Sequence, residues 1–187
     1  RYGSEARARA AAVLSLMVRG TPFLYAGEEL GLEDGVVPPE RVVDPDGRDG
    51  CRAPIPWTAD GDHEVGHGWP ARPWLPFPIN ASNNSAEAQV DEPASMHSLY
   101  RELLTLRHDH DVLRRGSIEF SSRGDDHVIR FERRLPDEYV VVLVNVSDAP
   151  ASWPIDLANA AVLLSTDRAR RSSGGELAPD EAVVLRP

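Results

Sequence analysis

The chain has 187 residues, of which 41% are hydrophobic, and a formal net charge of −10 from 20 basic and 30 acidic residues. A chain of this length and apolar content can bury a sizeable core, which excludes general disorder. The acidic balance argues against nucleic acid and anionic membranes as partners, because both attract clustered positive charge. Every basic residue is an arginine, so a Schiff-base lysine and a P-loop lysine are also excluded.

Cysteine usage and the apolar runs set further limits. Cys51 is the single cysteine, which excludes an internal disulfide and favours a reducing compartment, so we expect a cytoplasmic protein. No apolar run approaches the roughly 20 residues of a membrane-spanning helix, so we expect a soluble chain. The sequence lacks a signal-peptide pattern. It also begins with Arg1 instead of methionine, and this second feature suggests a piece of a longer protein.

The first 27 residues read as one α/β unit. Apolar residues between Ala6 and Met17 recur at helical spacing, Ser4 can cap the start, and Gly20 follows the last turn. Residues 21–26 then form a short apolar run, which is typical of a strand buried on both faces of a parallel sheet. The sequence therefore predicts a helix followed by a buried parallel strand.

Residues 31–92 hold most of the prolines and three of the tryptophans, which predicts a long, ordered and functional loop. A helix is predicted over residues 93–109, with Pro93 in its first turn. Beyond Gly116 the apolar period changes to that of strands. The expected strands lie at residues 118–120, 129–131, 139–144, 161–164 and 183–185. We therefore predict an α/β domain over residues 1–114 and an antiparallel β-sandwich over residues 115–187.

Two motifs resemble metal sites. Residues 63–67 match the zinc-peptidase pattern H-E-x-x-H, which requires both histidines on one helical face. Glycine and proline surround the motif and disfavour that helix, so we interpret the match as chance and keep a zinc peptidase as an alternative. Residues 44–49 resemble a calcium loop, but the fifth and sixth positions hold Arg48 and Asp49 instead of an oxygen ligand and glycine. The sequence predicts neither a metal site nor a cofactor.

Residues 48–57, Arg-Asp-Gly-Cys-Arg-Ala-Pro-Ile-Pro-Trp, are the best candidate for a binding site. Arginine presents a fixed fork of donors to sugar hydroxyls or to a carboxylate, and an aromatic ring can cover the apolar face of a pyranose. The alternative is an Arg–Asp pair that only pins a loop. The residues alone give the two interpretations about equal weight.

Taken together, these segments resemble glycoside hydrolase family 13, the α-amylase family. Residues 20–31 resemble its last barrel strand and the following turn, and residues 48–57 resemble the loop of its α-glucosidase and oligo-1,6-glucosidase branch. Residues 68–70, 73–76 and 87–90 are similar to later landmarks of that branch. The resemblance covers roughly residues 1–115 well and implies the last part of a (β/α)8 TIM barrel, followed by a C-terminal antiparallel β-sandwich.

The resemblance also implies a reaction and its residues. Family members retain anomeric configuration with a carboxylate nucleophile and a carboxylic acid/base, assisted by a third carboxylate. These three acids follow barrel strands four, five and seven, and this chain starts after strand seven, so no catalytic residue is expected in it. Arg52 matches the arginine that helps hold the terminal glucose, partly through an acid outside this chain, and Arg48 orients the loop or touches the next sugar.

We therefore expect the C-terminal part of a retaining, exo-acting α-glucosidase that acts on short oligosaccharides or sucrose-like substrates. The fragment alone is expected to be inactive, with the missing N-terminal barrel portion as its partner on the same or a separate chain. The alternatives are a stand-alone carbohydrate-binding or structural module, and a transglucosidase or isomerase of the same family.

Overall fold

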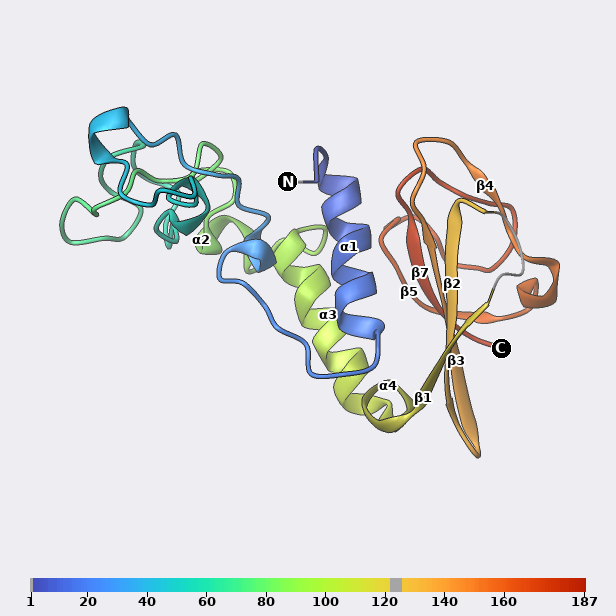
Figure 1. Cartoon of the computed structure of the whole chain (residues 1–187). Helices are drawn as coiled ribbons and strands as arrows, with labels where there is room; N and C mark the ends of the chain where they lie inside the picture. Colours follow the sequence, from blue (N-terminus) through green and yellow to red (C-terminus); the bar gives the residue numbers. More distant parts are fainter. Residues whose placement is uncertain (1, 122–125) are drawn as a thin grey trace. The chain divides into compact units, whose positions relative to one another are not determined.

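The computed structural model describes residues 2–121 and 126–187. Its helices are α1 (Glu5–Met17), α2 (Ala86–Gln89), α3 (Met96–Asp109) and α4 (Asp111–Arg115). Its strands are β1 (Ser117–Ser121), β2 (Val128–Leu135), β3 (Glu138–Asn145), β4 (Ala151–Ser152), β5 (Ala161–Ser165), β6 (Glu176–Leu177) and β7 (Ala182–Arg186). The chain divides into two compact units, residues 1–22 with 99–187 and residues 23–98 (Figure 1). The predicted boundary at residue 114 stays a prediction.

The helix expected near the N-terminus is present as α1. Ser4 caps it, since its hydroxyl accepts the Arg7 N–H at 3.1 Å, and the helix ends at Met17. Its C-terminal carbonyls are bound by two buried arginines. Arg107 of α3 donates to the carbonyls of Leu16 (2.7 Å) and Gly20 (2.5 Å). The negative end of the helix dipole thus meets positive charge.

Arg133 of β2 completes this arrangement and is fully buried. Its guanidinium donates to the carbonyls of Met17 and Leu113, both at 2.8 Å, and of Gly116 at 3.0 Å. Burial, together with the positive charges of neighbouring arginines, lowers the pKa of Arg133 to about 10. One cation therefore ties the end of α1, the end of α4 and the sheet together.

The predicted antiparallel β region is confirmed. The main sheet has the order β1-β2-β3-β7-β5, and every neighbouring pair is antiparallel. The apolar run at residues 139–144 lies in the middle strand, β3, as expected. β2 and β3 form a hairpin, with Leu135 opposite Glu138 across a two-residue turn.

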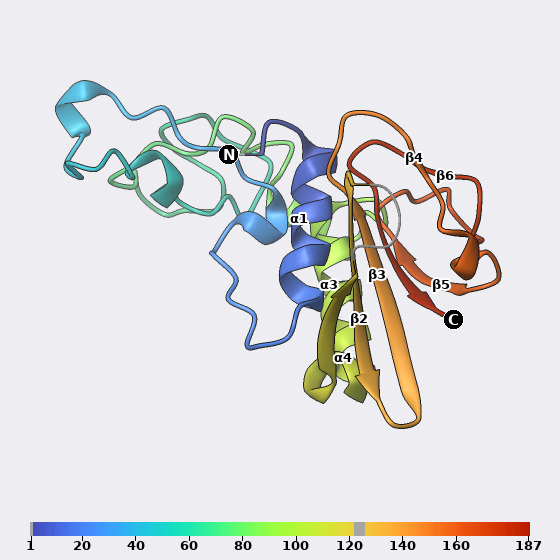
Figure 2. The ribbon, with the colours of Figure 1, turned by 45° about the vertical axis from the view of Figure 1, so that its right-hand side comes forward.

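The two faces of this sheet are covered differently. On one face, Val141, Leu143, Val183 and Leu185 share a core with the two-stranded sheet of β4 and β6 and with Trp153. On the other face, α1 contacts β3 and β7 while α4 contacts β2 and β3 (Figure 2). Alternate residues of the buried strands therefore point into two separate apolar layers, which explains their continuous hydrophobic sequence.

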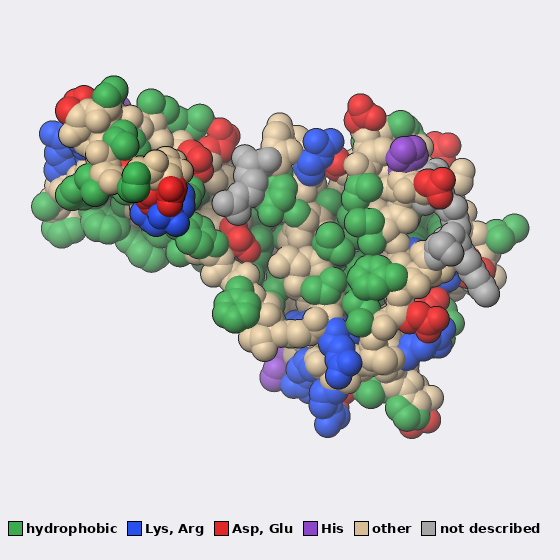
Figure 3. All heavy atoms as spheres, viewed as in Figure 1, with side chains coloured by type: hydrophobic (Ala, Val, Ile, Leu, Met, Phe, Trp, Pro, Cys, Tyr) green, Lys and Arg blue, Asp and Glu red, His purple; other side chains and the backbone are tan. Residues whose placement is uncertain are grey.

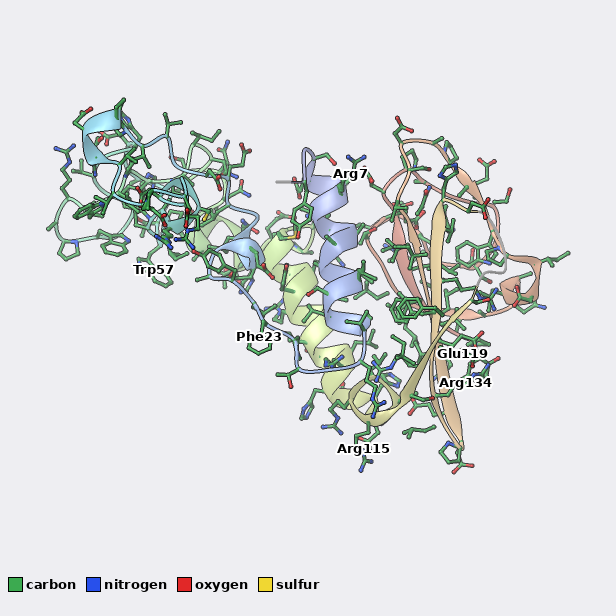
Figure 4. The ribbon with its side chains drawn as sticks, in the orientation of Figure 1. Arg7, Phe23, Trp57, Arg115, Glu119 and Arg134 are labelled. Atoms are coloured by element: carbon green, nitrogen blue, oxygen red, sulfur yellow. The ribbon has the colours of Figure 1, made fainter. Side chains whose placement is uncertain are left out.

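Two local expectations are wrong. Residues 21–25 are not a strand, and Phe23, which points away from the ribbon in Figure 4, is 86% exposed. A parallel strand needs neighbours along its edges, and no strand in the described ranges pairs with this segment. The third helix begins at Met96 instead of Pro93, because the Ser95 hydroxyl accepts the Ser98 N–H at 3.0 Å and caps the helix there.

Residues 23–98 form a unit built of turns, short helices and hydrogen-bonded loops. The carbonyl of Leu30 accepts side-chain amides from Asn84 (2.8 Å) and Gln89 (2.7 Å), which ties the start of the unit to α2. Phe77 is buried at the centre, in edge-on contact with the rings of His67 and Trp69. Within the described residues, no helix is both long and apolar enough to span a bilayer.

Candidate functional site

The candidate loop is shaped first by Asp49. Its buried carboxylate accepts the backbone N–H groups of Val43 (2.7 Å) and Asp44 (2.9 Å). These bonds close residues 43–49 into a compact turn, and a short 3₁₀-helix, Gly50–Arg52, follows directly. Asp49 is the acid inside the predicted motif, and these two hydrogen bonds join it to backbone groups instead of to Arg48 or Arg52.

Both predicted substrate-binding arginines meet at a different acid, Asp44. Arg48 donates from Nε to Oδ2 at 2.8 Å and from Nη2 to Oδ1 at 3.1 Å. Arg52 approaches Oδ2 with Nη1 at 2.5 Å. The Asp44 side chain is only 4% exposed, whereas those of Arg48 and Arg52 are 55% and 45% exposed. One buried carboxylate thus anchors two half-exposed guanidinium groups.

The electrostatics of this cluster follow from its geometry. The hydrogen bonds from Arg48 and from the backbone N–H of Asp46 lower the pKa of Asp44, and the charges of Arg48 and Arg52 add to the effect. The same contact with Asp44 raises the pKa of Arg48. At neutral pH Asp44, Arg48 and Arg52 carry one negative and two positive charges, and Asp46 adds a second negative charge where its exposed carboxylate pairs with Arg48 Nη2 at 3.0 Å. The exposed N–H donors of the two arginines suit a ligand rich in hydroxyl oxygens.

A second cluster of the same kind lies nearby in sequence. Arg41 donates to both oxygens of Glu64, at 3.0 and 2.8 Å, and Arg72 pairs with the same carboxylate. Arg41 also donates to the carbonyls of Pro73 and Trp74. Desolvation raises the pKa of Glu64, but the hydrogen bonds from Arg41 and Arg72 outweigh it and the net shift is downward. This cluster joins the loop near residue 41 to residues 64–74.

Exposed aromatic side chains accompany these clusters. Trp57 and Trp74 are 54% and 63% exposed, and Trp69 donates its indole N–H to the Ile55 carbonyl at 2.8 Å. The backbone N–H of Trp57 bonds to the His67 carbonyl at 2.9 Å, so the segments carrying Trp57 and Trp69 lie side by side. Apolar side chains gather along the lower edge of this unit in Figure 3, and Figure 4 labels Trp57 there. Such a surface suits the apolar face of a sugar ring.

The H-E-x-x-H segment does not form the helix that zinc peptidases require. Residues 63–65 are bends, Gly66 forms an isolated bridge with Gly61, and His67 lies in a turn with φ +52°, outside the helical region. His67 is buried and donates from Nδ1 to the Thr58 carbonyl at 2.9 Å, while the side chain of His63 is 75% exposed. In residues 2–121 and 126–187, no three His, Cys, Asp or Glu side chains gather in a way that would hold a metal ion.

Comparisons with known proteins give these features a context. The chain is 35% identical over 158 residues to a probable alpha-glucosidase of Rhizobium meliloti (strain 1021), covering 79% of this chain and 28% of that protein. It is 26% identical over 180 residues to the oligo-1,6-glucosidase of Parageobacillus thermoglucosidasius, covering 79% and 32%. The trehalulose synthase MutB from Pseudomonas mesoacidophila MX-45 superposes with a TM-score of 0.83 at 25% identity, over 99% of this chain and 40% of that one.

These relatives place the chain in a class of protein, the homologues of glycoside hydrolases. Within that class the chain belongs to the α-amylase family, glycoside hydrolase family 13, because residues 1–116 match the family description "Alpha amylase, catalytic domain". The predicted family is thereby confirmed. The chain spans about a third of the length of the curated relatives named above.

Proposed function

We propose that this chain is the C-terminal part of a retaining, exo-acting α-glucosidase that removes terminal α-linked glucose from short oligosaccharides or sucrose-like substrates. The observation that carries the proposal is the arginine loop. Arg52 directly precedes the run Ala-Pro-Ile-Pro-Trp and is anchored through Asp44 while half of its side chain stays exposed. In this role Arg52 holds the terminal glucose, and Arg48 orients the loop or contacts the next sugar.

The catalytic acids are proposed to lie outside this chain. A retaining mechanism needs two carboxylates roughly 5–5.5 Å apart that face a bound sugar. Three acids of residues 31–92 are already bound within the chain: Asp44 and Glu64 each bind two arginines, and Asp49 binds backbone N–H groups. The carboxylates would come from an N-terminal barrel portion, on the same or a separate chain, so the fragment by itself is inactive.

The exposed segment after α1 supports a missing barrel portion. Phe23, Leu24 and Tyr25 are all exposed in an extended stretch, although their sequence is typical of a doubly buried strand. Strands supplied by the rest of a (β/α)8 barrel would pair with this stretch and bury these side chains. In a stand-alone binding module these three apolar side chains would stay exposed to water, which is unfavourable. We also propose a cytoplasmic location, supported by the single, unpaired Cys51.

The test is to follow the anomer that the gene product of natural length releases from p-nitrophenyl α-D-glucoside, by proton NMR during the first minutes. α-Glucose appearing before mutarotation supports the proposal, whereas β-glucose or no turnover contradicts it. The likeness to a trehalulose synthase makes isomerisation the second candidate, and a solved MutB mutant at 26% identity and TM-score 0.82 holds the substrate sucrose. With sucrose, an isomeric disaccharide in place of free monosaccharides would identify that activity.

A further inference from the structure

Asp44 differs from the other acids of the loop in how it is held. Its side chain is buried to 4% exposure, yet both of its arginine partners remain about half exposed. Its position is fixed independently of them, because its own backbone N–H donates to Asp49 at 2.9 Å and its Oδ1 accepts the Asp46 N–H at 2.9 Å. The carboxylate is therefore a fixed point that anchors two half-exposed arginine side chains, of which Arg48 also pairs with Asp46 at 3.0 Å.

We propose that Asp44 is a positioning residue for sugar binding: it sets the direction of the Arg52 guanidinium, and of Arg48 beside it, toward the substrate. This inference rests on the proposed function and adds to it a residue that lies outside the motif of residues 48–57. A free arginine side chain loses rotamer freedom when a ligand fixes it, and this loss opposes binding. Anchoring Arg52 in the empty protein removes part of that cost from the binding step.

The two carboxylate oxygens of Asp44 have different arginine contacts. Oδ2 accepts both Arg48 Nε and Arg52 Nη1, and Oδ1 accepts Arg48 Nη2. Arg48 thus makes a two-bond fork, whereas Arg52 is held through Nη1, with 45% of its side chain exposed. Arg52 is the arginine better placed to donate to a ligand, and Arg48 closes the other side of the carboxylate.

The experiment uses the gene product at its natural length, with p-nitrophenyl α-D-glucoside as the probe. Asp44→Asn keeps the shape of the side chain but replaces an acceptor oxygen with an NH₂ group that repels the guanidinium donors. KM should rise about tenfold, with a smaller change in kcat, as expected when a charged hydrogen bond that organises substrate binding is lost. Asp44→Glu keeps the charge but moves it by one methylene, and it replaces Asp44→Asn if that variant does not fold.

Glu64→Gln is the matched control, because Glu64 is also a carboxylate held by two arginines in the same unit but is bonded to neither Arg48 nor Arg52 in the contacts described here. It should change thermal stability as Asp44→Asn does and leave KM within about twofold of the wild type. Arg52→Ala and the double variant with Asp44→Asn complete a cycle. If Asp44 acts through Arg52, the second substitution adds little once Arg52 is absent.

Each outcome separates the inference from the function beneath it. A raised KM for Asp44→Asn, a normal KM for Glu64→Gln and non-additivity with Arg52→Ala support the positioning role. An active wild type in which Asp44→Asn has normal kinetics, or in which Asp44→Asn and Glu64→Gln raise KM alike, overturns the positioning role while the α-glucosidase proposal stands. A wild type with no turnover of the probe overturns the proposed function and this role with it.

Discussion

Arg133 shows how a single residue can hold several elements through their backbone carbonyls. It is fully buried, and its bonds to Met17, Leu113 and Gly116 are all made to backbone carbonyls at the ends of helices α1 and α4. Those carbonyls have no further partner within their helices. The guanidinium supplies the donors, and the cost of burying its charge appears as a pKa lowered to about 10.

Replacing this arginine should therefore be costly. Arg133→Met keeps the volume but leaves several buried carbonyls without a charged donor, and we expect a loss of about 3 kcal/mol in the free energy of unfolding. Urea unfolding of the 187-residue chain measures it. Arg115→Met is the control, since that side chain is 71% exposed and pairs only with neighbouring Asp111 in the contacts described here, and it should change the midpoint little. If the two variants lost equal amounts of stability, the buried hydrogen bonds of Arg133 would not be what stabilises the fold.

Glu64 provides a test of pH dependence at the same scale. Its pKa in the folded chain is lower than in the unfolded chain, despite desolvation, because Arg41 and Arg72 bind the charged form. As the pH falls below the ordinary carboxyl range of about 4, the unfolded chain takes up the proton first. The stabilisation is therefore present at neutral pH and is lost as the pH falls through the lowered pKa.

The corresponding measurement compares wild type with Glu64→Gln in urea from pH 7 to pH 3. The wild type should be the more stable at pH 7, and the two curves should converge at low pH. A difference that stays constant across the range would mean that the ionised carboxylate contributes nothing through its arginines.

The candidate site was only partly predictable from these residues. The motif of residues 48–57 identified Arg48 and Arg52 as binding candidates, and no comparison or contact here tests their role with sugar. The sequence places Asp44 in a calcium-like pattern and near the site without a catalytic motif, and it does not indicate that Asp44 binds both arginines. Glu64 was considered only as part of a zinc pattern, although its partners lie 23 residues before it and eight after it. The spacing of Arg41, Glu64 and Arg72 along the chain does not predict that they form ion pairs.

At the scale of elements, the apolar pattern predicted the helices that local contacts stabilise and the strands whose neighbours lie within this chain. The capped helix α1, the central strand β3 and the antiparallel β region are all present. The predicted strand at residues 21–26 failed, because a parallel strand exists only when other strands pair with its edges. The helix predicted from Pro93 begins at Met96, because the serine cap decides its first turn.

The exposed stretch gives a prediction of its own. In the 187-residue chain, Phe23→Ala should leave the free energy of unfolding nearly unchanged, because Phe23 is 86% exposed. In the gene product of natural length, the same change should cost about 3 kcal/mol, because barrel strands would bury the ring. Phe77→Ala, which empties a buried position in the same unit, should be destabilising in both. If Phe23→Ala left the free energy of unfolding unchanged in both proteins, Phe23 would not be buried in a barrel.

At the scale of the whole molecule, the proposed enzyme is divided between this chain and a portion outside it. The chain belongs to the α-amylase family and matches that family's catalytic domain over residues 1–116, yet it spans about a third of its curated relatives. Its arginine loop is proposed to hold the sugar, and the carboxylates that cleave the bond are proposed to come from the rest of a barrel. Binding and chemistry would thus depend on two parts of one fold.

The most direct measurement is turnover of p-nitrophenyl α-D-glucoside by two samples side by side: the purified 187-residue chain and the gene product of natural length, each checked by intact mass. We expect no turnover above background by the 187-residue chain, whose mass is 20.5 kDa, and clear turnover by a heavier gene product. Turnover by the 187-residue chain, free of any other polypeptide, would show that the catalytic carboxylates lie within these residues and not in a separate barrel portion.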